Sequence, residues 1–583
     1  MADAGHAQVP IDWETCRVAD CIGERLPAGS TCWAHAGGED LDAALRALAD
    51  DRVLHARGVA FTADRLQRVL DAAPKPDEAV GDLRRALQVA NLDGSRLPAV
   101  RFAHLRCDGE ARFEHATFED ARFVEVTFGA PPATGEEEAA AEVGARLPGP
   151  MVSFQRATFL GATTFKTVAF HTGANFDDAH VEGDLEIDGD VAHGLTFRDA
   201  RFGGALVVRA RCLVGEVDVI FQRAVFAGPV DVSGLSSRGS VDFLGARFET
   251  ARNLGPLRTD RRLVMDGSVW RERALIEVST SRLDCRWARF LSGVELRIQP
   301  RGGTDVFLDD ADLAEPSVVA RTDGFVELDW SEDQSAAGAA DPPWPRILSL
   351  CGANVAGLTL AGVDLRACRF AGAHNLDRLR LDDVRFGWAP GRGRTRRQVI
   401  AEEIRWRQRH SSRVHDWTTV AAWPDDHAPD LLEAEQVAAI YRDLRKGRED
   451  DRDEPGATDF YYGEMEMRRA AATDVGERVV LTLYWLLSGY GLRAWRSLVA
   501  LAAVVVVTGS AFAAWGLDER APGAEPADLP TGLLVAARAG TAVFSTADVP
   551  LTTFGAWLHL GLRLAGPVLL GLAVLAVRGR VKR

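Results

Sequence analysis

The sequence predicts a mainly β solenoid, a stack of similar coils, with an α-helical N-terminal cap, a helical connector and two transmembrane α-helices. Large apolar residues recur at five-residue intervals through the middle of the chain, which indicates repeated coils. Two long apolar stretches lie near the C-terminus, and the segments on either side of the repeats have helical spacing. The 583 residues are 47% hydrophobic and 26% charged, which excludes a wholly disordered chain.

The N-terminal segment, residues 1–40, contains four potential metal ligands. Cys16, Cys21, Cys32 and His35 have the spacing C-x4-C-x10-C-x2-H. Thiolate and imidazole groups are the ligands that tetrahedral Zn²⁺ prefers, so the spacing predicts one structural zinc site. The alternative is that the cysteines are reduced and bind nothing. A catalytic zinc is not expected, because protein ligands would fill all four positions.

Residues 41–99 are predicted to form a helical cap. Leu41, Leu45 and Leu48 fall at positions i, i+4 and i+7, and Thr62 precedes a second helical segment as a candidate N-cap. An uncovered end of a solenoid would expose apolar side chains and unpaired backbone groups. We therefore expect these helices to cover the N-terminal end of the coils.

The repeat is clearest at Phe113, Phe118, Phe123 and Phe128, which are each five residues apart. This period fits neither a helix nor a strand, but it fits a square coil whose four short sides each turn one large and one small residue inward. The coils should stack at about 4.8 Å, with each large residue on its equivalents above and below. The predicted core is Phe113, Phe118, Phe123, Phe128, Phe159, Phe165, Phe170, Phe176, Phe202, Phe226 and Phe248.

The run ARFEHATFEDARFVEVTF at residues 111–128 resembles pentapeptide-repeat proteins, whose consensus is A(D/N)LXX with Leu or Phe at the centre. The resemblance implies a right-handed quadrilateral β-helix over residues 100–386. Residues 129–149 and 331–345 are predicted to be inserted loops, and residues 250–300 have weak periodicity.

Residues 387–496 are predicted to be a helical connector, with amphipathic helices at 394–410 and 431–450 and a helical aromatic tract at 459–470. Residues 479–496 are apolar and contain Trp485, Tyr490 and Trp495, which is typical of an interfacial helix with aromatic anchors. Together with the basic C-terminal tail, these motifs resemble the C-terminal region of membrane-anchored pentapeptide-repeat proteins.

Two transmembrane helices are predicted, at residues 497–517 and 554–577. The second contains Arg563, the one intramembrane charge that could have a functional role. Basic residues lie before the first span and in the tail at 578–583, whereas the loop at 518–553 contains five acidic residues against two basic ones. The distribution predicts a multi-pass protein of the plasma (inner) membrane with both termini in the cytoplasm and an extracytoplasmic, partly re-entrant loop. The high Arg and Ala content with few Lys suggests a bacterial source.

No motif for catalysis is present, so we expect a non-enzymatic membrane-anchored scaffold that presents a cytoplasmic rod for protein binding. The expected partners are the lipid bilayer, an unidentified cytoplasmic protein and a second copy bound through the transmembrane helices. The net charge of −16 argues against nucleic acid.

Two other functions are alternatives. The first is a two-span ion-channel-like or mechanosensing protein, although no potassium filter such as TVGYG lies between the spans. The second, raised by the resemblance, is a gyrase-binding DNA mimic. Mimicry needs a strongly negative rod, but residues 151–300 contain 19 basic and 19 acidic side chains.

Overall fold

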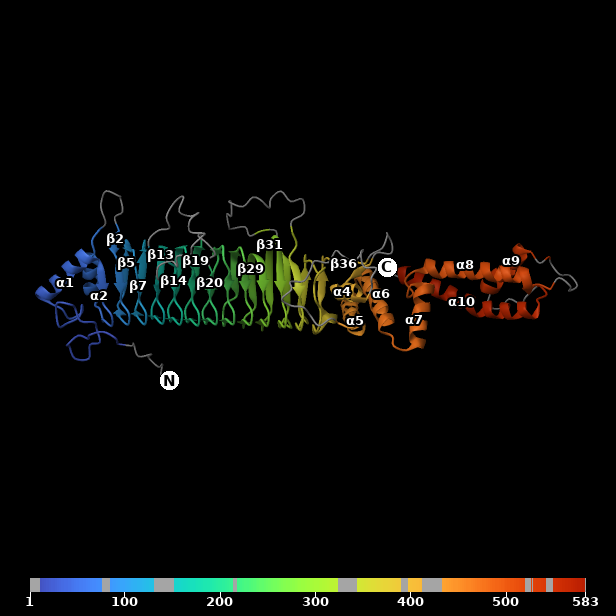
Figure 1. Ribbon diagram of the computed structural model, residues 1–583, viewed down its shortest axis with the longest axis horizontal. Helices are drawn as coiled ribbons and strands as arrows, with labels where there is room; N and C mark the ends of the chain where they lie inside the picture. The colour runs from blue at the N-terminus through green and yellow to red at the C-terminus, as the bar shows by residue number, and fades with distance from the viewer. Residues whose placement is uncertain are drawn as a thin grey trace. The chain divides into compact units, whose positions relative to one another are not determined.

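The computed structural model describes residues 11–75, 84–129, 151–212, 218–322, 324, 343–389, 397–410, 432–518, 526, 528–541 and 549–581 (Figure 1). The chain forms two compact units. The first contains the described residues up to Gly387, and the second contains those from Trp388 onwards.

The first unit is a β-solenoid of about 11 turns, which confirms the predicted fold class. Its strands pair in parallel with the equivalent strands of the neighbouring coils (Figure 1). One side of the coils forms a nine-stranded sheet of two-residue strands. These strands are β4 (Arg96–Leu97), β8 (Thr117–Phe118), β12 (Thr158–Phe159), β15 (His180–Val181), β18 (Arg201–Phe202), β21 (Val225–Phe226), β25 (Arg247–Phe248), β28 (Val269–Trp270) and β30 (Arg289–Phe290).

The other sides form a 26-stranded sheet. Its strands are β1 (Val53–His55), β2 (Arg85–Leu87), β3 (Val89–Asn91), β5 (Val100–Ala103), β6 (Leu105–Cys107), β7 (Ala111–Arg112), β9 (Ala121–Val124), β10 (Thr127–Phe128), β11 (Val152–Ser153), β13 (Thr163–Phe170), β14 (Ala174–Asn175), β16 (Leu185–Val191), β17 (Leu195–Thr196), β19 (Leu206–Cys212), β20 (Val219–Ile220), β22 (Val230–Asp231), β23 (Ser236–Ser237), β24 (Val241–Asp242), β26 (Asn253–Thr259), β27 (Arg262–Val264), β29 (Ala274–Asp284), β31 (Val294–Phe307), β32 (Ser317–Arg321), β33 (Arg346–Ser349), β34 (Leu358–Ala361) and β35 (Arg380–Asp382).

Columns of stacked aromatic rings fill the middle coils of the solenoid. All eleven phenylalanines of the predicted core are buried, each 3% exposed or less. The longest column contains six rings, with successive centroids 4.7–5.0 Å apart. This column consists of Phe113, Phe154, Phe176, Phe197, Phe221 and Phe243. The ring spacing equals the distance between strands in a sheet, so the backbone ladder and the aromatic core repeat together.

A recurrent corner explains the alanine that stands two residues before many of the phenylalanines. At this corner the residue before the alanine has positive φ, as at His115 (57°) and Arg156 (55°). The N–H of Ala116 donates to the carbonyl of Phe113 at 3.1 Å, and later coils repeat the bond. The alanine methyl points inward and Ala116 is 0% exposed, so a larger side chain would not fit there.

The solenoid begins earlier than the predicted boundary at residue 100. Strand β1 already pairs in parallel with β3, and β2 pairs with β6. Among the described residues of the predicted cap, 41–75 and 84–99, the helices are α1 (Gly38–Asp51) and α2 (Ala63–Ala72). The spacing of phenylalanines does not reveal the first coils, because leucines fill their core. These are Leu87, Leu92 and Leu97, each 1% exposed or less.

The helical part of the cap lies at the N-terminal end of the coils (Figure 1). The Thr62 hydroxyl accepts from the N–H of Arg65 at 3.4 Å, which confirms Thr62 as the N-cap of α2. In α1, Leu41 and Leu48 are buried.

The coils continue without interruption through residues 250–300. Here β26, β29 and β31 are 7, 11 and 14 residues long, so two sides of each coil join into one strand. Burial then alternates along the strand, and the five-residue period disappears from the sequence. Of the two predicted loops, residues 130–150 and 325–342 lie outside the described residues. Residues 343–345 belong to the packed structure, since the Arg385 guanidinium carbon lies 3.8 Å from the Trp344 ring centroid.

The second unit is mainly helical. The 3-10 helix η3 (Leu376–Arg378) belongs to the first unit. The short strand β36 (Gly387–Trp388) spans the boundary, and β37 (Gln398–Val399) lies in the second unit. Its helices are α4 (Ala401–His410), α5 (Ala434–Asp450), α6 (Glu454–Ala471), α7 (Val475–Ser488), α8 (Ala494–Ala511), the π-helical turn η7 (Phe512–Gly516), α9 (Leu529–Thr541) and α10 (Thr553–Val581).

The predicted interfacial helix at 479–496 is two elements. Helix α7 ends at Ser488 because Gly489 takes the left-handed conformation, with φ of 56°. Tyr490 follows in the turn and is 1% exposed, so it is a core residue of this unit and not a surface anchor. Trp495, by contrast, lies on α8 and is 56% exposed.

Candidate functional site

The four predicted metal ligands converge at the N-terminus. One ligand atom from each of Cys16, Cys21, Cys32 and His35 lies within 4.8 Å of all the others, so the cluster could hold a metal ion. The Sγ atoms of Cys21 and Cys32 are 3.8 Å apart. His35 Nδ1 lies 3.4 Å from the Sγ of Cys32 and 3.6 Å from that of Cys16.

These separations fit a tetrahedral ion. Zinc–ligand bonds of about 2.3 Å to sulfur and about 2.0 Å to nitrogen give tetrahedron edges of about 3.8 Å between two sulfurs and about 3.5 Å between sulfur and nitrogen. Gly23 permits the close packing, since a Cβ atom at that position would lie 3.0 Å from the Sγ of Cys32. The backbone of the segment is fixed by the N–H of Cys16, which donates to the Gly23 carbonyl at 2.8 Å, and by Trp33, whose Nε1 donates to the His55 carbonyl at 2.7 Å.

The thiols have opposite ionisation behaviour when no ion is bound. Burial opposes ionisation of Cys16, but N–H groups of Val18 and Cys32 and the contact with His35 outweigh it and lower its pKa to about 7. Burial raises the pKa of the Cys32 thiol to about 12. A divalent cation would favour the thiolate form of both.

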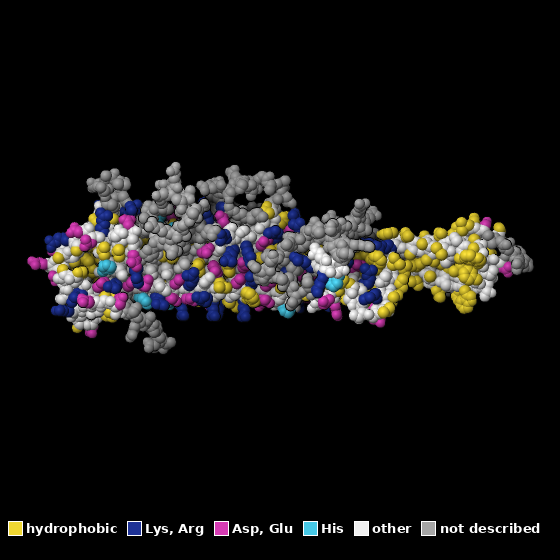
Figure 2. Space-filling view, viewed as in Figure 1, with side chains coloured by type: hydrophobic (Ala, Val, Ile, Leu, Met, Phe, Trp, Pro, Cys, Tyr) yellow, Lys and Arg dark blue, Asp and Glu magenta, His cyan; other side chains and the backbone are white. Residues whose placement is uncertain are grey.

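A second candidate site is the pair of apolar C-terminal helices. Residues Trp495–Gly516 and Thr553–Val574 are each 22 residues long, and both are long and apolar enough to cross a membrane. Their large apolar side chains point outward: Val507 is 68% exposed and Trp557 is 71% exposed. Figure 2 shows these side chains covering the surface of α8–α10. A surface of this kind is stable against lipid and costly in water.

Glycine contacts join the three C-terminal helices. A Cβ atom at Gly532 would lie 2.3 Å from the Gly509 carbonyl oxygen, and one at Gly566 would lie 2.1 Å from that of Gly540. Close backbone approach at small residues is typical of helix packing in membranes. The short α9, within the predicted extracytoplasmic loop, therefore packs against both α8 and α10. The core between them contains Phe512, Leu517, Val535, Ala536, Ala539 and Leu562.

Replacing Gly566 with alanine should destabilise this helix packing by about 1–3 kcal/mol, because the new methyl group collides with backbone. Gly571 on the same helix is the matched control, since no atom lies within 4 Å of a Cβ built there. Thermal unfolding of the detergent-solubilised protein should show a lower midpoint for Gly566→Ala than for Gly571→Ala. Equal midpoints would contradict the helix packing described.

Arg563 lies in the middle of α10 and is half-buried. His559, one turn earlier on the same helix, is 8% exposed. Sequence reasoning singled out the arginine and left the more buried histidine without a role.

The connector contains a buried ionic network that the sequence analysis missed. Glu403 is 0% exposed, and its Oε1 lies 2.5 Å from Arg397 Nη2 and 2.6 Å from Arg407 Nε. The Tyr441 hydroxyl donates to its Oε2 at 2.6 Å. Burial opposes ionisation, but the two guanidinium groups outweigh it and lower the pKa of Glu403 to about 2.

The network continues towards the turn before α8. Arg407 Nη2 lies 3.1 Å from Glu466 Oε2, and the Tyr490 hydroxyl donates to Glu466 Oε1 at 3.0 Å. Tyr462, next to these groups, accepts a bond of 3.1 Å from Trp485 Nε1. The tyrosines come from the motifs noted in the sequence, but nothing there indicated that the glutamates are buried.

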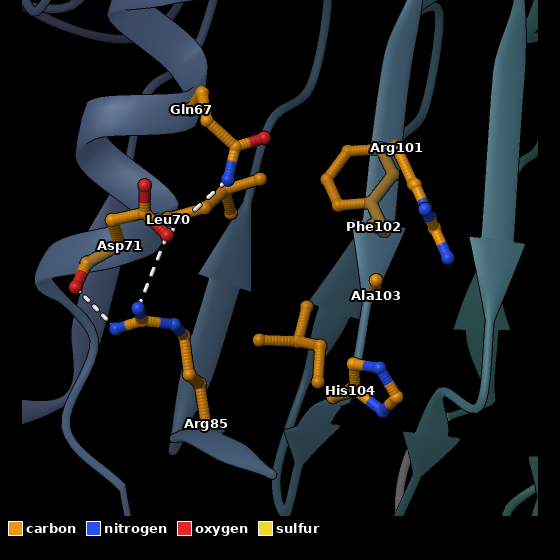
Figure 3. A pocket seen from close by; sticks show the side chains of 9 residues that line it. Gln67, Leu70, Asp71, Arg85, Arg101, Phe102, Ala103 and His104 are labelled. Atoms are coloured by element: carbon orange, nitrogen blue, oxygen red, sulfur yellow. Dashed lines mark hydrogen bonds and ion pairs between the residues drawn. The ribbon is translucent and has the colours of Figure 1, made fainter.

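A small open cavity of about 220 Å³ lies beside α2 and β5 (Figure 3). Two of its charged or titratable groups are already paired: Arg85 Nη2 lies 3.1 Å from Asp71 Oδ1, and His104 Nδ1 lies 2.8 Å from Glu125 Oε2. The cavity is the junction between the cap and the first coils. It is lined by Gln67, Leu70, Asp71, Arg85, Arg101, Phe102, Ala103, His104 and Leu105.

Residues 143–189 match the family model described as pentapeptide repeats (9 copies). The described part of this match includes the coil with Phe154, Phe159, Phe165 and Phe170. No curated protein matches the chain, and no solved structure does. The chain thus carries pentapeptide repeats folded as a β-solenoid, together with two candidate membrane helices. A solenoid of this kind is typically non-enzymatic and suits a protein-binding rod.

Proposed function

We propose that this protein is a non-enzymatic scaffold that is anchored in a bacterial plasma membrane and presents its solenoid to a cytoplasmic protein. The outward-facing apolar side chains of α8 and α10 carry the proposal, because water-facing helices do not expose Val507 and Trp557 to this extent. The basic residues that flank the two spans support a cytoplasmic location for both termini. We also propose that this helix surface binds a second copy within the bilayer.

The test is to separate membranes from the cytosol in cells that express the full chain, and to treat the membranes at alkaline pH. The full chain should stay with the membranes, whereas a chain that ends at residue 474, before α7, should be released. Crosslinking the solubilised full chain should then capture a cytoplasmic protein. Release of the full chain at alkaline pH would overturn membrane anchoring.

For the N-terminal cluster, we propose one structural Zn²⁺ bound by Cys16, Cys21, Cys32 and His35. The donor set and its separations support zinc. When bound, the ion would cross-link a segment that is too short to have its own apolar core. The protein's contribution is to hold the four ligands on a backbone that Trp33 fastens to β1.

Replacing Cys32 with serine should reduce the zinc content of the purified protein from one ion to none. The N-terminal segment should also lose protection from amide hydrogen exchange, because its cross-link is gone. Cys351→Ser, outside the cluster, is the matched control and should keep the ion. Equal zinc content in the two variants would show that the cluster is not the site.

A second candidate function is an ion-conducting protein. The short α9 supports it. This helix lies between α8 and α10 in the sequence and packs against both, and the pore segments of two-span channels also lie between two spans in the sequence. Current measured across a bilayer that contains the reconstituted protein would separate this function from the scaffold. If an assembled, reconstituted oligomer carries no current, the ion-conducting function is excluded.

A further inference from the structure

The nine-stranded side of the solenoid has an unusual line of outward-facing residues. In consecutive coils, parallel pairing places Arg201, Val225, Arg247, Val269 and Arg289 directly beside one another. The three arginines are exposed and the two valines are half-buried. We call this line the arginine ladder. Figure 2 shows basic side chains at regular intervals along one edge of the solenoid.

The three arginines of the ladder have no acidic partner among the residues that the structure describes. The neighbouring acids are engaged elsewhere: Asp199 pairs with Arg223, and Glu249 pairs with Arg271. Asp312 occupies the next position after Arg289 in the ladder; its Oδ1 accepts from Asn354, and its carboxylate forms no ion pair with Arg289. Three unpaired positive charges therefore stand in a row on a chain with a net charge of −16.

Two exposed apolar side chains stand at one end of the ladder. Trp287 is 57% exposed and Leu291 is 51% exposed, and they flank Arg289 in the same coil. Tryptophan and arginine are enriched among the residues that dominate protein–protein binding energy. Exposed apolar groups beside unpaired charges favour a protein segment over nucleic acid, whose binding rests on phosphate contacts.

The spacing indicates the form of that segment. Alternate coils are about 9.6 Å apart, at about 4.8 Å for each coil. Residues seven apart on an α-helix are about 10.5 Å apart, and those three or four apart are about 4.5–6 Å apart on the same face. A helix with carboxylates at i, i+7 and i+14 would match the arginines, and apolar residues between them would match the valines.

We propose that the arginine ladder binds an acidic amphipathic helix of a partner protein, with Trp287 and Leu291 contacting an apolar residue at one end. This inference rests on the proposed scaffold function and names the surface and the chemistry of the partner. The charges would speed association and fix the register, and the apolar contacts would slow release.

The experiment uses the full chain in detergent and a labelled 18-residue helical peptide. The peptide has Glu at positions 1, 8 and 15, and Leu on the same helix face between the glutamates. Fluorescence anisotropy should show that this peptide binds about tenfold more tightly than a scrambled peptide of equal composition, as three exposed charge pairs allow. Substituting R201Q, R247Q and R289Q together should remove this preference. R68Q, R96Q and R252Q together are the matched control, because each of these exposed arginines already has an acidic partner.

Equal binding of the two peptides, or equal loss in the two triple variants, would overturn the inference. Tighter binding of a single-stranded oligonucleotide than of the peptide would also overturn it, in favour of nucleic acid. Neither result touches the proposed function, since membrane retention and partner capture are measured without this peptide.

Discussion

Replacing Phe221 with alanine will destabilise the solenoid by about 3–5 kcal/mol, because it opens a cavity inside a stacked column. Phe221 is 0% exposed, and its ring lies between Phe197 at 4.9 Å and Phe243 at 4.8 Å. Coils contact only their neighbours, so the loss should be largest in the flanking coils. Denaturant unfolding measures the total loss of unfolding free energy, and native-state hydrogen exchange shows which coils lose stability.

The matched control is Leu244→Ala in the next coil. Leu244 is also apolar but 40% exposed, so its removal should cost less than about 0.5 kcal/mol. A similar loss in both variants would mean that the rings do not form the core of the coils.

Replacing Glu403 with glutamine should destabilise the helical connector by about 3–5 kcal/mol. The substitution keeps the shape of the side chain but leaves the buried guanidinium of Arg397 without its counter-charge. Glu435→Gln on the exposed face of α5 is the control and should have little effect. Thermal unfolding of the solubilised chain checks both variants, and equal midpoints would contradict a structural role for the network.

The same carboxylate predicts how stability depends on pH. The pKa of Glu403 is lowered to about 2 in the folded chain, below its usual value of 4.5. As pH falls, the unfolded chain therefore binds the proton first. The stabilisation by Glu403 is complete above pH 4.5 and is lost progressively as pH falls towards 2. The free energy of unfolding should be measured for wild type and for Glu403→Gln at pH 3 and pH 7. The difference between the two proteins should be larger at pH 7.

The sequence predicted the solenoid because its core uses one residue type at one spacing. Where the core uses leucine, as at Leu92 and Leu97, or where long strands such as β29 replace short sides, the same fold has no distinct period. The clustering of Cys16, Cys21, Cys32 and His35 was also predictable, since their chemistry is specific and their spacing is local. The columns were only partly predicted: Phe154, Phe197, Phe221 and Phe243 lie outside the residues named from the five-residue pattern, although they are 0% exposed.

The buried glutamates could not be predicted in the same way. Glu403 and Glu466 lie on helices whose sequences look solvated. Arg397 and Arg407 are close to Glu403 in the sequence, but the tyrosines that donate to the two glutamates, Tyr441 and Tyr490, come from other elements. The partners in this network are separated by as many as 59 residues, as in the pair of Arg407 and Glu466. Local patterning can indicate the i,i+4 pair of Glu403 and Arg407, but it does not indicate the contacts with Tyr441 and Tyr490.

The repeated alanine corner makes the rod adjustable in length. Coils with short strands close with the same turn and pair through the same backbone hydrogen bonds, so inserting or deleting one such coil leaves both new neighbours matched. Every such event moves the metal-ligand cluster relative to the last coil by one strand spacing, about 4.8 Å. Gene duplication within this region can thus change the distance between the N-terminal cluster and the last coil in small equal steps.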